Sequence, residues 1–325
     1  MSVCLSVEEF LQLGGQCIDI RSPGEFSHAH IPTACSVPLF TDSERAAVGT
    51  VYKKVGRKEA VRLGVSLVGP KLPALFEALE QIPGTKKIYC WRGGMRSSFV
   101  CNFLSSLQIP CVQLEGGYKA FRRKMLSSLQ QPPALVVLGG MTGSGKTEFL
   151  RRFQGPHIDL EALACHRGSV FGEEKGVVPP SNEQFENMLA FSLRALPKNT
   201  ALLVEDESRM IGSCTIPDAF YNAMQEAPVV VLETPKQQRI ERILRLYGDF
   251  SAAWWCEKTV KIQKRLGSQM TNQALAYIGQ GRLFEAIDLL LTYYDKAYEH
   301  ALNKHKGPKI RCSEEQVLDA LRSVS

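Results

Sequence analysis

The chain has 325 residues, of which 44% are hydrophobic and 22% are charged, and its formal net charge is +6. This composition excludes a largely disordered protein, and the length exceeds what one ordinary hydrophobic core organises, so we expect two domains. The basic balance favours a polyanionic partner such as RNA, although many basic proteins bind no nucleic acid.

The sequence indicates neither a membrane protein nor a disulfide-stabilised secreted protein. No apolar run is long enough to span a bilayer, and residues 1–13 contain Glu8 and Glu9 and lack the basic start of a signal peptide. The ten cysteines form no Cys-x-x-Cys pair and the six histidines form no ligand cluster, which argues against a zinc ribbon. We therefore expect a cytoplasmic protein with reduced cysteines.

The first part of the chain is predicted to form an α/β domain, which we place at residues 1–126. Short apolar runs predict strands at 17–20, 87–90 and 111–114, and apolar residues at helical spacing predict helices at 73–81 and 98–107. The alternation of strands and helices favours a largely parallel sheet. The helix at 98–107 is expected to bury one apolar stripe, made of Phe99, Val100, Phe103, Leu104 and Leu107.

A cysteine loop follows the second of these strands, with the sequence Cys-Trp-Arg-Gly-Gly-Met-Arg-Ser at residues 90–97. A strand end, two glycines and a helix start direct backbone N–H groups at the sulfur, and Arg92 and Arg96 add positive charge. Both effects stabilise a thiolate. An average cysteine at a strand end is simply buried, but this setting predicts that Cys90 is a nucleophile with Arg92 and Arg96 as its catalytic partners.

A linker is expected at residues 127–133, which contain Pro132 and Pro133, and a second α/β domain at residues 134–325. Apolar runs predict strands at 135–138, 202–205 and 229–232, and a helix is expected at about 147–153. The remainder is predicted to be helical, with its clearest amphipathic stretch at 282–301.

The second domain carries a complete P-loop, G-x-x-x-x-G-K-T at residues 140–147, between a predicted strand and a predicted helix. Such a loop wraps a diphosphate with its N–H groups, and the strand-end acids Asp206 or, alternatively, Glu205 would face a metal ion. Thr147 and Asp206 would hold magnesium if it binds. The predicted phosphate-binding residues are Gly140, Thr142, Gly143, Ser144, Gly145, Lys146, Thr147, Asp206 and Arg209.

A series of motifs resembles a known family. Asp19, Arg21 and Glu25, with the segment that follows them, are similar to the start of rhodanese domains, in which these residues form a structural scaffold. The whole series closely resembles the tRNA 2-selenouridine synthase family, although no single motif is that specific. The motifs lie at residues 19–21, 90–97, 115–119, 140–147, 159–161, 166–169, 185–187 and 205–212.

The resemblance implies a rhodanese-like parallel-sheet domain followed by a P-loop NTPase-like α/β domain with a helical C-terminal part. It further implies an enzyme that replaces sulfur by selenium in wobble 2-thiouridine of tRNA. In that family selenophosphate is the selenium donor, and the reaction passes through an S-geranyl intermediate made from geranyl diphosphate. A thiolate at Cys90 would carry selenium as a perselenide or receive it from selenophosphate.

Several implications of the resemblance stay open. The P-loop could hold geranyl diphosphate, ATP or both, and the enzyme that produces selenophosphate is a candidate partner. Gly64 is a guess for the entry of the geranyl tail, and Trp91 could stack on the wobble base or pack under the loop. The candidate RNA contacts are Lys119, Arg122, Arg123 and Arg167, because they lie beside the matched motifs.

One departure from sulfurtransferase rhodaneses keeps a second function open. The loop from Cys90 to Arg96 is one residue longer than usual and has the Cys-x5-Arg spacing with which phosphatases wrap a phosphate. Tyr89 replaces the histidine usual in those enzymes, and no general acid can be assigned. The alternatives are therefore a phosphatase fused to a nucleotide-binding module and a non-catalytic, nucleotide-gated RNA-binding regulator.

Overall fold

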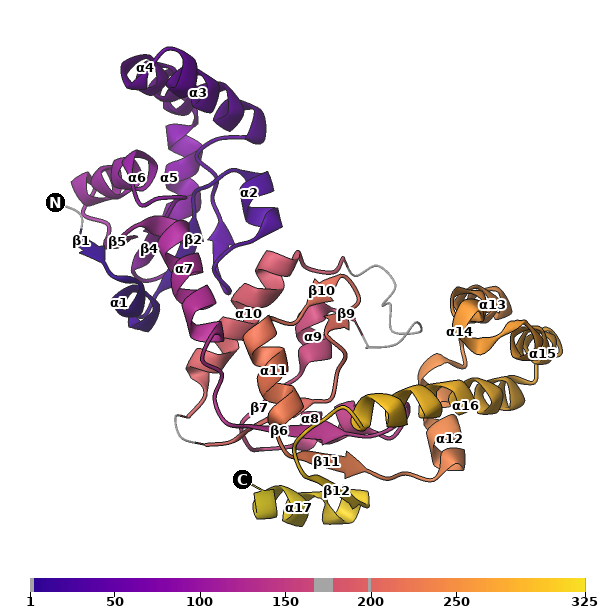
Figure 1. Ribbon diagram of the computed structural model, residues 1–325. Helices are drawn as coiled ribbons and strands as arrows, with labels where there is room; N and C mark the ends of the chain where they lie inside the picture. The colour runs from indigo at the N-terminus through magenta and orange to yellow at the C-terminus, as the bar shows by residue number, and fades with distance from the viewer. Residues whose placement is uncertain (1–2, 167–177, 198–199, 325) are drawn as a thin grey trace. The chain divides into compact units, whose positions relative to one another are not determined.

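The computed structural model describes residues 3–166, 178–197 and 200–324 and divides into two compact units (Figure 1). The N-terminal unit comprises residues 1–128 and 180–191, and the P-loop unit comprises residues 129–179 and 192–325. Residues 180–191, which follow the P-loop in sequence, therefore belong to the N-terminal unit. The predicted boundaries, 1–126 and 134–325, place them in the second domain.

The N-terminal unit is built on a five-stranded parallel sheet with strand order β1-β5-β4-β2-β3. The strands are β1 (Val3–Leu5), β2 (Gln16–Asp19), β3 (Cys35–Ser36), β4 (Lys86–Tyr89) and β5 (Cys111–Leu114). The three predicted strands are the inner ones, and the sequence missed only the short edge strands β1 and β3. The central strand β4 is buried along its whole length, as a strand covered on both faces must be.

Seven helices of the described chain accompany this sheet: α1 (Val7–Gln12), α2 (Pro23–His28), α3 (Asp42–Lys54), α4 (Arg57–Val68), α5 (Leu72–Glu80), α6 (Met95–Ser106) and α7 (Gly117–Leu129). Helix α6 buries Val100, Cys101 and Leu104. Phe99 and Leu107 are 39% and 45% exposed, so the predicted stripe is wrong at both positions. Leu107 already lies at the end of α6, and Phe99 falls beside the buried face.

The predicted linker is also shorter than expected. Helix α7 continues to Leu129, whose side chain is fully buried, so that the chain leaves the helix only at residue 130. Pro132 and Pro133 then prevent a helix from continuing into the next strand.

The P-loop unit contains a second five-stranded parallel sheet, with order β12-β11-β6-β8-β7, and a separate two-stranded hairpin. The sheet strands are β6 (Leu135–Gly139), β7 (His157–Ile158), β8 (Leu202–Glu205), β11 (Val229–Leu232) and β12 (Lys309–Cys312). Strand β12 corrects the prediction that everything after residue 232 is helical. It pairs with β11 only and carries exposed Lys309 and Arg311, so it lacks the apolar run of an inner strand.

The helices of this unit and the hairpin are α8 (Lys146–Arg152), α9 (Leu160–Ala164), α11 (Asp218–Glu226), α12 (Lys236–Tyr247), α13 (Ala252–Lys261), α14 (Gln263–Leu266), α15 (Ser268–Gly279), α16 (Leu283–Leu302), α17 (Val317–Val324), β9 (Met210–Ile211) and β10 (Cys214–Thr215). Helices α12 to α16 share a core that includes Ile240, Trp255, Ile287 and Leu290. Helix α10 (Asn182–Ala195) begins within the N-terminal unit. No helix among the described residues could cross a membrane.

Candidate functional site

The cysteine loop joins β4 to α6 and is supported by the loop that follows β5. Gly93 has a φ of 61°, and a Cβ there would lie 2.5 Å from the carbonyl oxygen of Leu114, so only glycine fits. The backbone N–H of Tyr118 donates to the Cys90 carbonyl oxygen at 2.8 Å, and that of Lys119 donates to the Trp91 carbonyl oxygen at 3.0 Å. The motif at residues 115–119 therefore serves to fix the cysteine loop.

Cys90 is only 3% exposed, and its Sγ lies 3.2 Å from the Ser97 Oγ. Burial by itself raises the pKa of Cys90. The Ser97 hydroxyl, the Arg96 charge and backbone N–H groups outweigh the burial, so that the pKa of Cys90 is lowered below that of an ordinary thiol. One of these N–H groups belongs to Arg92. The loop therefore favours the thiolate, as the sequence predicted.

The two predicted arginines differ in their settings. Arg96 is partly buried and its Nη1 lies 3.4 Å from Glu25 Oε2, while Glu25 Oε1 is 3.6 Å from Arg45. Arg92 is exposed on the loop. Arg96 thus lies where its charge acts on Cys90, whereas Arg92 contributes through its backbone N–H.

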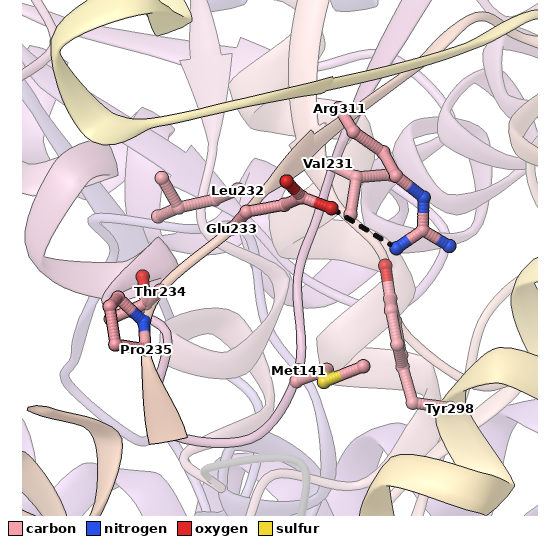
Figure 2. A pocket seen from close by; sticks show the side chains of 8 residues that line it. All are labelled: Met141, Val231, Leu232, Glu233, Thr234, Pro235, Tyr298 and Arg311. Carbon is pink, nitrogen blue, oxygen red and sulfur yellow. Dashed lines mark hydrogen bonds and ion pairs between the residues drawn. The ribbon is translucent and has the colours of Figure 1, made fainter. Parts of the chain in front are cut away.

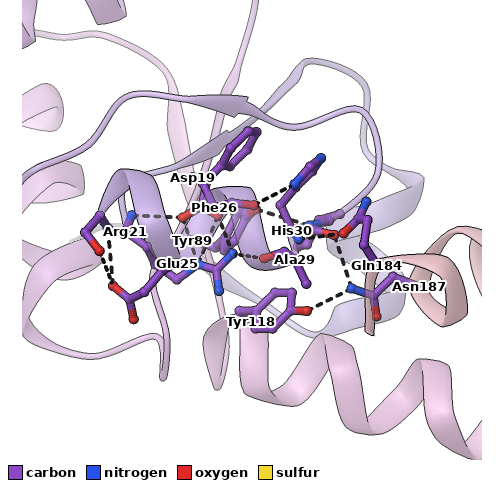
Figure 3. Close-up of polar contacts among 12 residues, drawn as sticks. Asp19, Arg21, Glu25, Phe26, Ala29, His30, Tyr89, Tyr118, Gln184 and Asn187 are labelled. Carbon is purple, nitrogen blue, oxygen red and sulfur yellow. Dashed lines mark hydrogen bonds and ion pairs between the residues drawn. The ribbon is translucent and has the colours of Figure 1, made fainter. Parts of the chain in front are cut away.

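Figure 3 shows a buried ion pair between Arg21 and Asp19. Arg21 is 1% exposed, and its Nη2 donates at 2.6 Å both to Asp19 Oδ2 and to the Ala29 carbonyl oxygen. Its guanidinium lies 4.0 Å from the centroid of the Tyr118 ring. These contacts agree with the scaffold role that the resemblance implies for Asp19 and Arg21.

Helix α10 completes this scaffold with residues from far along the chain. The Tyr118 hydroxyl donates to Glu183 Oε1 at 2.6 Å and accepts from Asn187 Nδ2 at 2.8 Å. The backbone N–H of His30 donates to Gln184 Oε1 at 2.7 Å (Figure 3). The motif at residues 185–187 therefore belongs to the support of the N-terminal unit.

The candidate RNA contacts do not share one environment. Lys119 and Arg123 are exposed. Arg122 is ion-paired with Glu186 and donates to Asn187 Oδ1 at 3.0 Å, which makes it part of the α10 contact. Arg167 lies outside the described residues. Trp91 is 37% exposed, and its ring centroid is 5.6 Å from that of Tyr118, so the indole is not packed under the loop.

A pocket of about 400 Å³ opens beside Trp91 within the N-terminal unit. It combines both signs of charge, and its lining residues are Arg21, Ser22, Gly24, Glu25, His28, Asp42, Arg45, Trp91 and Glu183. Such a lining suits a polar ligand better than an apolar one.

The P-loop has the geometry of a diphosphate cradle. Gly140, Gly143 and Gly145 have φ values of 151°, 79° and 99°, and helix α8 begins directly after them at Lys146. A Cβ on Gly140 would lie 2.5 Å from the Ser144 Oγ and 3.0 Å from the Leu232 carbonyl oxygen. The Lys146 Nζ donates to the Gly140 carbonyl oxygen at 2.8 Å. The structure thus brings the predicted residues 140–147 together at a helix N-terminus.

Three glutamates lie beside this cradle. Ligand oxygens of Glu161, Glu205 and Glu207 all lie within 4.8 Å of one another, and the Thr147 Oγ1 donates to Glu161 Oε2 at 3.3 Å. Burial, together with the neighbouring carboxylates, raises the pKa of all three and brings that of Glu207 to about 8. Both carboxylate oxygens of Glu205 are buried without a hydrogen-bond partner. A hard divalent cation would satisfy this donor set.

Asp206, the predicted metal-facing residue, lies in a different cluster. Its Oδ1 is 2.9 Å from the His305 Nε2, and it accepts a hydrogen bond from the Tyr298 hydroxyl. Successive side chains after a strand point to opposite sides, so Asp206 faces away when Glu205 and Glu207 face the cradle. The alternate choice, Glu205, is the one that the structure brings into the acidic cluster. Arg209 is exposed and ion-paired with Asp218.

Three side chains that the sequence did not indicate also bind the backbone of the P-loop. Arg239 Nη1 donates to the Thr142 carbonyl oxygen at 3.2 Å, and Arg242 Nη1 donates to the Gly143 carbonyl oxygen at 2.8 Å. The backbone N–H of Gly140 donates to the Tyr298 hydroxyl at 2.7 Å. These residues come from α12 and α16, and no local signal distinguishes them from ordinary helix-surface residues.

A second pocket, of about 460 Å³, begins at the P-loop residue Met141 (Figure 2). Its buried part is formed by Val231 and Leu232 of β11. Around them lie Glu233, Thr234, Pro235, Tyr298 and Arg311. We call this the β11 pocket.

Comparison with known proteins identifies both units. Residues 6–124 match the rhodanese-like domain, and residues 133–283 match the AAA domain of tRNA 2-selenouridine synthase. A protein named tRNA 2-selenouridine synthase from Shewanella woodyi is 37% identical over 91% of this chain and 90% of its own length. The chain belongs to the tRNA 2-selenouridine synthase family. Relatives of the same name from Aeromonas salmonicida and Pseudomonas fluorescens are 37% and 38% identical, covering 93% and 94% of this chain and 91% and 93% of their own lengths.

Membership of the tRNA 2-selenouridine synthase family confirms the predicted fold class, a rhodanese-like parallel-sheet domain followed by a P-loop α/β domain with a helical C-terminal part. It also confirms that the chain is an enzyme. The regulator without catalytic activity, one of the two alternatives, is thereby excluded.

Proposed function

We propose that this enzyme is a transferase that replaces sulfur by selenium in wobble 2-thiouridine of tRNA. The observation that carries the proposal is the match over about nine-tenths of the chain to relatives named tRNA 2-selenouridine synthase. Two anion sites with different chemistry support it: a loop that favours a thiolate at Cys90 and a P-loop suited to a diphosphate.

The P-loop unit would carry out the first step, S-geranylation from geranyl diphosphate. The thiocarbonyl sulfur attacks the first carbon of the geranyl group, the carbon–oxygen bond breaks, and pyrophosphate leaves with the bonding electrons. Lys146 and the N–H groups of residues 142–146 would hold the departing pyrophosphate. Alkylation is required because thiocarbonyl sulfur is a poor leaving group, whereas a thioether sulfur leaves as a thiol.

Magnesium fits this site on the evidence of its side chains. Thr147, Glu161 and Glu207 would hold the ion, and Glu205 would supply the charge of its two unpartnered oxygens. Bound magnesium would supply positive charge toward the diphosphate. Asp206 has no part in this proposal, because His305 and Tyr298 already occupy its carboxylate.

The β11 pocket would hold the geranyl tail. It starts at Met141 of the P-loop, and polar side chains in its lining already have hydrogen-bond or ion-pair partners within the protein. Arg311 is paired with Glu233 and Glu299, and Thr234 donates to the Ser144 carbonyl oxygen. A nucleotide base needs free hydrogen-bonding groups for its recognition, whereas a hydrocarbon needs none. This favours a prenyl group over ATP at this position.

The N-terminal unit would carry out the second step, with selenophosphate as the selenium donor and Cys90 as the reacting residue. Selenium then displaces the geranylated sulfur at the base. The exposed Lys119 and Arg123 are the remaining described candidates for tRNA phosphates, and the enzyme that makes selenophosphate is a candidate partner.

The deciding experiment incubates the full chain with 2-thiouridine-containing tRNA, geranyl diphosphate and selenophosphate, followed by digestion and mass spectrometry of the nucleosides. We expect geranylated uridine without selenophosphate and selenouridine with it. Absence of both products would contradict the proposed function. Release of phosphate from an aryl phosphate ester, with neither uridine product, would favour the alternative, a phosphatase fused to a nucleotide-binding module.

A further inference from the structure

We propose that Cys90 attacks the phosphorus of selenophosphate, forms a transient S-phosphocysteine and releases hydrogen selenide. This inference rests on the proposed function, because it takes selenophosphate as the donor. It differs from the rhodanese route, in which the chalcogen would be transferred to the cysteine sulfur as a perselenide.

The loop supports attack on phosphorus through its length and its contacts. Cys90, Arg96 and Ser97 stand in the order Cys-x5-Arg-Ser, the spacing that wraps a tetrahedral phosphate. The guanidinium of Arg96 is partly buried and bonds Glu25 at 3.4 Å through a single nitrogen. Because a guanidinium carries five N–H donors, Arg96 can keep this contact and still bind phosphate oxygens.

The Ser97 hydroxyl is suited to both halves of a phosphoryl transfer. Its Oγ lies 3.2 Å from the Cys90 Sγ and 3.1 Å from the Gly94 carbonyl oxygen, so its one hydrogen can go to either. Donation to the sulfur stabilises the thiolate before attack. It also stabilises the same thiolate when it later leaves phosphorus. A cysteine that only carried selenium as a perselenide would not require a hydrogen-bond donor to stabilise its thiolate as a leaving group.

Burial of the sulfur argues in the same direction. Cys90 is 3% exposed, and Trp91 beside it is 37% exposed. Selenium fixed on this buried sulfur would be less accessible to a nucleobase of tRNA than the sulfur is to selenophosphate, because the nucleobase on its RNA is much larger. Hydrogen selenide is released as the small anion HSe−, which can leave the loop to reach the base.

The oxidation states also favour this route. In selenophosphate the phosphorus has the oxidation state of phosphate, and the selenium has that of selenide. Moving selenium onto a thiolate as a perselenide would leave the phosphorus–selenium electron pair on phosphorus, and the product would be phosphite. Attack on phosphorus changes no oxidation state and therefore requires no additional oxidant or reductant.

The complete sequence balances. The sulfur–phosphorus bond forms, the phosphorus–selenium bond breaks, and its electron pair leaves on selenium, which takes one proton. Water then attacks phosphorus, the sulfur–phosphorus bond breaks, and phosphate and the Cys90 thiolate are released. Hydrogen selenide attacks carbon 2 of the S-geranylated base, and geranyl thiol leaves. The net reaction consumes one selenophosphate and one water.

The test follows phosphorus. The full chain is mixed with radiophosphorus-labelled selenophosphate and quenched within milliseconds in detergent at neutral pH. The radioactivity bound to the protein is counted, and the released products are identified by phosphorus NMR. We expect label on Cys90, phosphate as the product, and no label on Cys90→Ser. Phosphite as the product, with selenium bound to Cys90, would overturn the inference.

Ser97→Ala supplies the graded test, with Ser98→Ala as its matched control. Ser98 also donates to the Gly94 carbonyl oxygen at 3.1 Å, and its second partner is Gln113. We expect Ser97→Ala to slow phosphate release by about 10- to 100-fold, as loss of a hydrogen bond to a charged group does, and Ser98→Ala to slow it less than threefold. Equal effects of the two variants would contradict the role given to Ser97.

The same samples separate this inference from the proposed function. If selenouridine forms without label on Cys90 and without phosphate release, the phosphocysteine inference is contradicted and the proposed transferase function is supported. If tRNA gains no selenium although Cys90 is labelled, attack on phosphorus is supported and the transferase proposal fails. Failure of both readouts would overturn both.

Discussion

At the scale of residues, Cys90 shows how neighbours change an ordinary buried thiol. Burial acts against its ionisation, and the Ser97 hydroxyl, the Arg96 charge and the loop N–H groups reverse that effect. The sequence indicated the arginines and glycines of this loop. Among the contacts that lower the pKa of Cys90, the hydrogen bond from the Ser97 hydroxyl has the largest effect.

Removal of the Cys90 thiol should separate the two reaction steps. We expect Cys90→Ala to abolish selenouridine and to retain geranylated uridine, since the P-loop unit contains the proposed geranylation site. Mass spectrometry of digested tRNA measures both nucleosides in one sample. Cys17→Ala, in another buried cysteine of the same unit, is the control and should keep both products. Loss of geranylation with selenation intact would contradict this division.

The acidic cluster leads to a prediction about protons. Because the pKa of Glu207 is raised to about 8, this carboxyl is protonated at pH 7 in the free protein. Magnesium binding should therefore release protons at pH 7, from Glu207 and from the other two carboxyls whose pKa is raised, and fewer protons above pH 8, where Glu207 is largely ionised. Calorimetry in two buffers of different ionisation enthalpy measures this release. Glu207→Gln should reduce this release and Asp206→Asn should retain it in full; the opposite pattern would assign the metal to Asp206.

At the scale of elements, the P-loop is held by helix α12, whose residues follow it by about a hundred positions. Arg242 of α12 donates to the Gly143 carbonyl oxygen at 2.8 Å and to Glu148 Oε2 at 2.9 Å. We expect Arg242→Gln to weaken pyrophosphate binding by about 10- to 100-fold, since the loop loses a charged hydrogen bond that orients its N–H groups. Arg245→Gln, on the exposed side of the same helix, should leave the calorimetric affinity unchanged. Equal pyrophosphate affinities of the two variants would contradict the role of α12 in orienting the P-loop.

The β11 pocket gives a second prediction at this scale. Met141→Gln keeps the side-chain length but inserts an amide into the pocket, so geranyl diphosphate should bind about tenfold more weakly. Pyrophosphate, which has no tail, should bind as before. Met210→Gln is the control, because Met210 is 61% exposed. A parallel loss of pyrophosphate affinity would indicate a distorted P-loop, and an unchanged geranyl diphosphate affinity would exclude the tail from this pocket.

At the scale of the whole molecule, residues 180–191 complete the N-terminal unit although they follow the P-loop in sequence. Tyr118 joins them to α7 through its bonds to Glu183 and Asn187. We expect Tyr118→Phe to lower the free energy of unfolding by about 1–3 kcal/mol, because the buried Asn187 amide loses an acceptor. Chemical denaturation measures this. Tyr52→Phe is the control and should have little effect, because Tyr52 is 52% exposed. Equal stability of the two variants would contradict the role of Tyr118 in joining residues 180–191 to α7.

The inner strands, the cysteine loop and the P-loop were predictable from the sequence alone. These features depend on contiguous residues, namely short apolar runs bounded by turns and glycine-rich segments with a fixed spacing of charged groups. The family was predictable as well, because the series of motifs extends over nearly the whole chain. The amphipathic helix at 282–301 was predictable for the same reason and is displaced by only one residue.

The meeting of residues far apart in the chain could not be predicted and became visible in the folded structure. The sequence favoured Asp206 for the metal, and the alternation of side chains after β8 turned that carboxylate toward His305 while Glu161 joined Glu205 and Glu207. It suggested Arg122 for RNA, and the return of α10 paired that side chain with Glu186. Arg239, Arg242 and Tyr298 gave no local signal. Their roles come from backbone groups far away in the chain, and such contacts exist only once the fold has brought both partners together.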